Sequence, residues 1–128
     1  MRDLSEINDA IGALAKNPHN GLILLSDAFT WVNREVVVRS ANYHRVPSIY
    51  PFREFIEAGG LLSYGVYQLE QWPRAASYVD RILKGEKPAD LPVQQPTKFE
   101  LIINMRTAKA LSIAIPANLL ALADEVIE

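Results

Sequence analysis

The sequence predicts an α/β fold of three layers, in which helices cover a mostly parallel β-sheet. Short apolar runs of strand length alternate with segments of helical periodicity along the chain. The run Leu22–Leu25 is continuously apolar, which is typical of a strand buried on both faces of a parallel sheet. More than a dozen residues separate this run from the next predicted strand, Pro47–Tyr50, and parallel strands need a crossover of that length. Together these observations favour an alternating α/β architecture.

The composition is that of one ordinary globular domain. The chain has 128 residues, of which 49% are apolar and 22% charged, so we expect a single α/β domain over residues 1–128. The net charge of −2 gives no electrostatic reason to expect nucleic acid as a partner. The absence of cysteine excludes disulfides and thiolate chemistry.

The first helix and strand are marked by periodicity and turn residues. Apolar residues recur at helical spacing from Leu4 to Leu14, and Ser5 is the predicted N-cap. The turn residues Asn17–Gly21 end this helix, and the strand Leu22–Leu25 follows. Beyond that strand, Thr30 is the predicted cap of the next helix.

The segment Trp31–Arg45 is ambiguous by local propensity alone. Val36–Val38 favours a strand, because β-branched residues are enriched there. However, the strand Pro47–Tyr50 follows soon afterwards, and a parallel connection requires a helix between the strands. We therefore predict a helix over Trp31–Arg45.

The remaining elements follow from apolar runs separated by glycine and proline. Three prolines between Glu86 and Pro96 predict an extended connector. Val79, Ile82 and Leu83 are predicted to point inward from the long helix that precedes it. The predicted order is a helix over 52–58, a strand over 61–65, a helix over 68–84, the connector, a strand over 99–103 and short helices over 107–111 and 116–122.

Several ordered motifs give the chain a family resemblance. They are Ile49–Phe55, Tyr78–Gly85, Pro88–Val93, Pro96–Leu101 and Thr107–Leu111. With these motifs the chain resembles the C-terminal part of periplasmic substrate-binding proteins of ABC transporters, of the tryptophan and tyrosine type. One departure is Ser112, where the family usually has a glycine that can turn left-handed at a helix end. The resemblance predicts a strained or differently closed helix end at this residue.

The resemblance implies a fold, a function and partners. The fold would be one Rossmann-like lobe of a type I periplasmic-binding-protein fold, equivalent to the C-terminal lobe and tail, with the N-terminal lobe not represented. The function would be non-covalent capture of a small solute, such as an amino acid, for an ABC permease, with no cofactor. The resemblance implies that the protein is periplasmic. Residues 1–6 show no signal peptide, however, so the chain on its own would imply the cytoplasm.

Candidate ligand residues follow the predicted strands, because ligands of open α/β folds bind beyond the carboxyl ends of the strands. Asp27 could hold an ammonium group, Phe29 or Phe52 could cover an apolar group, and Arg53 could pair with a carboxylate. The alternative is structural: Asp27 caps a helix, both phenylalanines are core, and Arg53 pairs with Glu57. The full set of predicted ligand residues is Asp27, Phe29, Thr30, Tyr50, Phe52, Arg53 and Tyr64.

Enzymatic and metal chemistry have no support in the sequence. There is no G-x-S-x-G elbow and no glycine-rich phosphate loop after a strand, and the two histidines are best explained as solvated residues. A second hypothesis is a truncated, self-associating interaction module that transports nothing. Apolar faces exposed by the missing lobe would then favour a homodimer, formed by exchange of the segment beyond Gly65.

Overall fold

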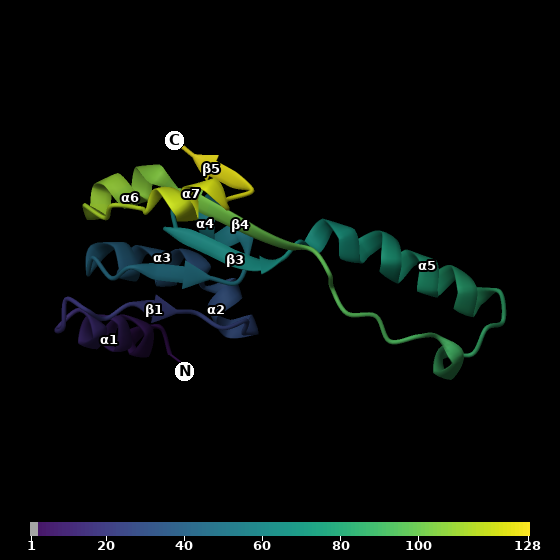
Figure 1. Ribbon diagram of the computed structural model, residues 1–128. Coiled ribbons are helices and arrows are strands. Elements are labelled where there is room, and N and C mark those ends of the chain that lie inside the picture. Colours follow the sequence, from purple (N-terminus) through teal and green to yellow (C-terminus); the bar gives the residue numbers. More distant parts are fainter. Residues whose placement is uncertain (1–2) are drawn as a thin grey trace. The chain divides into compact units, whose positions relative to one another are not determined.

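The computed structural model describes residues 3–128, which form two compact units (Figure 1). The first unit contains residues up to Gly65 together with Glu100–Glu128 and holds the sheet. The second unit, Val66–Phe99, contains one long helix and the connector. The prediction of one domain over residues 1–128 is not tested by this division.

The sheet has five strands in the order β1-β2-β3-β4-β5. Their bounds are β1 Leu22–Ile23, β2 Ser48–Tyr50, β3 Leu62–Val66, β4 Phe99–Asn104 and β5 Glu125–Ile127. β1, β2 and β3 pair in parallel, and so do β4 and β5. The mostly parallel α/β sheet is thus confirmed, but the prediction of four strands is wrong. The short strand β5 was not predicted, because a pattern of three residues is too short to show the periodicity of a strand.

β4 runs antiparallel to β3. The amide of Tyr67 donates to the carbonyl of Lys98, and that of Asn104 donates to the carbonyl of Leu61. Residue numbers that rise on one strand therefore meet numbers that fall on the other, which defines an antiparallel pair. As a consequence, the amino ends of β4 and β5 lie at the same edge of the sheet as the carboxyl ends of β1, β2 and β3.

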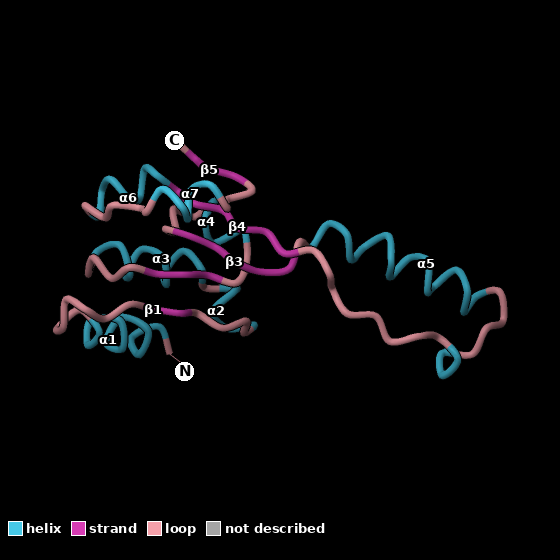
Figure 2. Tube along the Cα trace, viewed as in Figure 1, coloured by secondary structure: helices cyan, strands magenta, loops and turns pink. Residues whose placement is uncertain are grey.

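The helices follow the predicted alternation with two corrections of detail (Figure 2). The segment predicted as one helix is two, because the chain breaks at Asn33. The first helix is capped by Asp3 and not by Ser5. In this unit the helices are α1 Leu4–Leu14, α2 Ala28–Val32, α3 Arg34–Tyr43, α4 Arg53–Glu57, α6 Met105–Leu111 and α7 Ala117–Ala121.

The core of this unit lies between the sheet and helices α1, α3 and α4. Its buried apolar side chains are Ile7, Ile11, Val37, Val38, Ala41, Val46, Tyr50, Phe55, Ile56 and Ile102. Each valine, isoleucine or phenylalanine side chain of this cluster contributes about 1.5–3 kcal/mol when it is removed from water, so the cluster is the main source of stability. The carbonyl of Gly59 is bound twice, by the Asn42 side chain of α3 and the Thr107 hydroxyl of α6, which ties both helices to the end of α4.

Helix ends are closed by left-handed residues. Arg45, Gly59, Gly85 and Ser112 have φ between 55° and 100°. Each is followed by an amide that donates to the carbonyl five residues back, as in Ile113 to Ala108, which is the Schellman closure. The expectation of a strained end at Ser112 is confirmed, because a non-glycine residue occupies the left-handed region with φ 59°.

β1 is an edge strand and is not buried on both faces as predicted. Leu22 and Leu24 pack against the core, but Ile23 is 74% exposed and Leu25 is 77% exposed. Side chains alternate across a strand, so the exposed pair lies on the face opposite the core. A continuous apolar run does not show whether a strand is central or at an edge, which is why the prediction failed.

The second unit consists of a 3₁₀ turn Gln68–Glu70 and the helix α5 Gln71–Leu83, followed by the connector with a 3₁₀ turn Pro88–Asp90. Within this unit the Tyr78 hydroxyl donates to the carbonyl of Pro92, and Arg81 pairs with Glu86. No residue of α5 is buried. The prediction that Val79, Ile82 and Leu83 point inward is therefore wrong for this structure.

Candidate functional site

The predicted ligand residues gather at one edge of the sheet. Asp27, Phe29 and Thr30 lie beyond the carboxyl end of β1. Tyr50 ends β2, and Phe52 and Arg53 follow it. Tyr64 lies in β3 and is 55% exposed. Because β1, β2 and β3 are parallel, these positions share the edge at which α/β folds bind ligands.

Asp27 and Thr30 form a local capping pair at the start of α2. The Asp27 Oδ2 accepts from the Thr30 amide at 3.0 Å, and the Thr30 hydroxyl donates to the Asp27 carbonyl at 3.1 Å. Asp27 is thus the N-cap, and the prediction that Thr30 caps this helix is wrong. Asp27 is exposed while Thr30 is buried, so only the carboxylate is open to a solute in this conformation.

The aromatic candidates differ in exposure. Phe29 and Phe52 are partly buried and pack against the core cluster. Tyr50 is 1% exposed and stacks on Phe55, with ring centroids 5.0 Å apart. Tyr64 is the most open of the four predicted aromatic ligand residues.

The phenol of Tyr50 is a buried polar group with no partner among the described residues. Burial raises the pKa of Tyr50 to about 12, and the nearby Ser48 hydroxyl opposes this shift. Ser48 itself donates to the carbonyl of Val46 at 2.8 Å. Tyr50 is therefore a core residue in this structure, and at 1% exposure its ring is closed to solvent.

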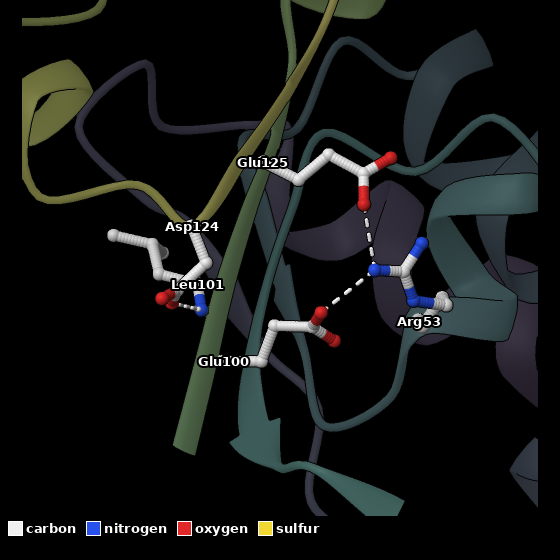
Figure 3. A network of polar contacts seen from close by, with 5 residues as sticks. All are labelled: Arg53, Glu100, Leu101, Asp124 and Glu125. Atoms are coloured by element: carbon white, nitrogen blue, oxygen red, sulfur yellow. Dashed lines mark hydrogen bonds and ion pairs between the residues drawn. The ribbon is translucent and has the colours of Figure 1, made fainter. Parts of the chain in front are cut away.

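Arg53 is held by two carboxylates from distant parts of the chain (Figure 3). Its Nη2 lies 2.7 Å from Glu100 Oε1 and 2.6 Å from Glu125 Oε2. These hydrogen bonds and charges raise the pKa of the guanidinium, so it stays protonated. The predicted structural pairing with Glu57 is replaced by this Arg53–Glu100–Glu125 network, whose partners lie 47 and 72 residues away.

Glu100 and Glu125 are site-edge residues that sequence reasoning missed. They lie at the amino ends of β4 and β5, which share this edge only because β4 reverses direction. No pattern of the sequence shows that reversal. The network carries a formal charge of −1, so a ligand carboxylate approaching Arg53 would compete with two carboxylates of the protein.

A second set of contacts fixes these two glutamates (Figure 3). The Leu101 amide donates to Asp124 Oδ2 at 2.8 Å, and the Asp124 amide donates to the Leu101 carbonyl at 2.9 Å. This reciprocal pair precedes the register Ile102 to Glu125. Glu125 is thus opposite Ile102, two residues beyond Glu100, and both glutamate side chains reach Arg53.

Metal binding and membrane spanning were both considered for the part of the chain that the structure describes. Among residues 3–128, no group of three or more His, Asp or Glu side chains could hold a metal ion. Within the same residues, no helix has both the length and the apolar character needed to span a membrane. The His44 ring lies 3.3 Å from the Asn8 amide oxygen, away from the predicted ligand residues.

The sheet, its covering helices and the polar edge define an α/β lobe of the kind found in periplasmic binding proteins. The chain belongs to the family of ABC transporter substrate binding proteins, because the model of this family matches residues 1–127. This family consists of binding proteins and not of enzymes.

Similar proteins agree with this assignment. The chain is 28% identical over 107 residues to a tyrosine-binding protein of Clostridioides difficile strain R20291, covering 84% of this chain and 31% of that protein. A conserved domain protein of Vibrio cholerae has a similar structure, with a TM-score of 0.87, 27% identity and coverage of 98% of this chain and 42% of that chain. The ABC domain of Streptococcus pneumoniae in complex with L-Trp has a TM-score of 0.86 with 26% identity, covering 99% and 44% respectively. The chain thus spans less than half the length of each of these relatives.

Proposed function

We propose that this chain forms one side of a cleft that captures a small solute, an amino acid, for delivery to an ABC permease. The observation that carries this proposal is the family match over nearly the whole chain, together with the shared sheet edge of the candidate residues. The names of two relatives, one tyrosine-binding and one in complex with L-Trp, support an aromatic amino acid as the solute. In this role the protein acts outside the cytoplasmic membrane, performs no chemistry and needs no cofactor.

The accessible candidates suggest how the solute would be held. Asp27 offers an exposed carboxylate for an ammonium group, and Tyr64 offers an exposed ring for an aromatic side chain. Phe29 and Phe52 would form the apolar wall, with Thr30 and Tyr50 behind it. Arg53 already forms ion pairs with Glu100 and Glu125 and would hold this edge of the sheet in place. A carboxylate of the solute would bind Arg53 only in competition with these two glutamates.

Thermal unfolding against a panel of ligands tests this proposal. A ligand present at 100 times its dissociation constant should stabilise the protein by about 2.7 kcal/mol, which raises Tm by several degrees. We expect L-Trp or L-Tyr to do so, and the Tyr64→Ala variant to lose the effect at the same ligand concentration. Equal Tm values with and without every amino acid of the panel would contradict solute capture by this chain.

A second candidate function is self-association, favoured by the apolar surface of α5. Trp72 is 70% exposed and Leu83 is 81% exposed, and Val79 lies between them on the same helical face. A surface of this kind marks an association site. In this reading the chain is a homodimer formed through the segment beyond Gly65. Light scattering of the unmodified chain and of Leu83→Asp tests it: a dimer that becomes a monomer supports the role of α5.

A further inference from the structure

Phe52 of the proposed solute edge lies in a short loop that is held from both sides. The loop consists of Pro51 and Phe52 and joins β2 to α4. Before Phe52, the Pro51 carbonyl lies so close to β3 that a Cβ at Gly65 would be 1.9 Å from its oxygen. After Phe52, Arg53 binds one carboxylate of β4 and one of β5 (Figure 3). The position of Phe52 is therefore set by a contact to β3 on one side and by contacts to β4 and β5 on the other.

The ion pairs of Arg53 hold the start of a helix that has no side-chain cap. Phe52 is the N-cap residue of α4, and its side chain makes no capping hydrogen bond. The helix has only five residues, and so short a helix depends on tertiary contacts for its stability. Arg53, its first residue, makes two such contacts at 2.7 and 2.6 Å. The start of α4, and with it Phe52, thus depends on β4 and β5 for its position.

The two carboxylates are themselves fixed by the backbone beside them. Leu101 follows Glu100, Asp124 precedes Glu125, and two hydrogen bonds of 2.8 and 2.9 Å join Leu101 to Asp124. The Glu100 side chain is only 17% exposed. The network is therefore in place without any solute, as a preorganised binding site requires.

We propose that Glu100 and Glu125, acting through Arg53, are positioning residues that set the affinity for the solute without contacting it. This inference rests on the proposed function, because it requires the solute to bind at this edge and to pack on Phe52. Holding the loop at Phe52 before binding lowers the free-energy cost of ordering it in the complex. A loop that is held less firmly therefore binds the same solute more weakly.

The sign of the change in affinity distinguishes positioning from two other roles of the network. If Arg53 bound the carboxylate of the solute directly, Glu100→Gln would remove a competing carboxylate and would tighten binding. If the network only stabilised the fold, Glu100→Gln would lower the free energy of unfolding and leave the dissociation constant of the folded protein unchanged. Positioning predicts weaker binding by the folded protein, which neither of the other roles gives.

Calorimetric titration of the full chain with L-Trp and L-Tyr tests this, at a temperature where circular dichroism shows every variant folded. Glu100→Gln should raise the dissociation constant about three- to tenfold. Glu125→Gln should raise it less, because this side chain is 43% exposed. The matched control is Glu57→Gln, which removes the same charge from the other end of α4, outside the network, and should leave the dissociation constant unchanged.

The outcomes separate this inference from the proposed function. Unchanged or tighter binding by Glu100→Gln, or an equal loss of affinity in Glu57→Gln, would overturn the inference and leave solute capture intact. If the unmodified chain bound neither amino acid, the proposed function would fail, and the inference would fail with it.

Hydrogen exchange provides a second measurement, which needs no solute. The Phe55 amide donates to the Phe52 carbonyl at 3.2 Å, so its exchange rate reports on the start of α4. We expect this amide to exchange faster in Glu100→Gln than in the unmodified chain or in Glu57→Gln. Equal exchange rates in all three proteins would equally overturn the inference, because the network would then not hold the loop.

Discussion

Arg53 and Glu100 are joined by an ion pair of 2.7 Å although they lie 47 residues apart in the sequence. The pair links the start of α4 to β4, the strand that reverses direction in the sheet. Glu125 joins the same guanidinium nitrogen from β5. The network therefore connects the parallel part of the sheet to the pair β4 and β5 at the proposed solute edge.

Removing one carboxylate should weaken this connection. Glu100→Gln should lower the free energy of unfolding by about 1 kcal/mol, because charge-assisted bonds are stronger than neutral ones and this side chain is only 17% exposed. Glu125→Gln should cost less, on the order of 0.5 kcal/mol, since exposed pairs contribute little. Urea unfolding at low and high salt measures both. A larger loss for Glu125→Gln than for Glu100→Gln would contradict this ranking.

Gly65 lies where the backbone of β3 comes close to the loop after β2. A Cβ at this position would lie 1.9 Å from the Pro51 carbonyl oxygen, a distance that no small adjustment relieves. Gly65→Ala should therefore destabilise the protein by several kcal/mol, in the range of severe overpacking.

Gly85→Ala is the matched control for Gly65→Ala. Gly85 has φ +100°, but apart from its neighbours along the chain nothing lies within 4 Å of a Cβ placed there. This change should cost only the backbone strain of about 1–2 kcal/mol. Thermal unfolding of both variants provides the comparison, and similar losses would show that the close approach at Gly65 is relieved by movement of the chain.

Ser112 closes α6 in the left-handed conformation at φ 59°. Ser112→Gly should raise the free energy of unfolding by about 1 kcal/mol, because glycine adopts this conformation without the Cβ penalty. Arg45→Gly, at φ 55°, should act in the same direction at the end of α3. Chemical denaturation measures both, and a loss of stability in the two variants would mean that the side chains contribute more than the strain costs.

The sequence predicted the elements that repeat a simple pattern. The helix over Trp31–Arg45 was identified against its local β propensity, because two parallel strands required a crossover. The family resemblance indicated the unusual helix end at Ser112. The break at Asn33 was missed, since helical periodicity continues on both sides of it.

The direction of β4 and the partners of Arg53 could not be predicted, because both depend on contacts between distant residues. Glu57 lies one helical turn from Arg53 and was the natural partner by local spacing. Glu100 and Glu125 reach Arg53 only because the chain returns from Val66–Phe99 in the opposite direction. The candidate edge was therefore predicted from its β1, β2 and β3 side alone, and its acidic side was missed.

Tyr50 carries a buried hydroxyl that has no partner among residues 3–128, and this predicts two measurable effects. Tyr50→Phe should raise the free energy of unfolding by about 1 kcal/mol, because an unsatisfied buried polar group costs free energy that the phenylalanine ring avoids. The ring stack on Phe55 should remain.

The second effect is on the dependence of stability on pH. Burial raises the pKa of Tyr50 to about 12 in the folded state, whereas an unfolded tyrosine titrates near 10. Between these values the unfolded chain has lost a proton that the folded chain keeps, so this contribution to stability is full below pH 10 and is lost as pH rises through 12. Absorbance titration should show a late ionisation step near pH 12, and Tyr50→Phe should remove this step. A late step that persists in Tyr50→Phe would assign it to another tyrosine and contradict the prediction.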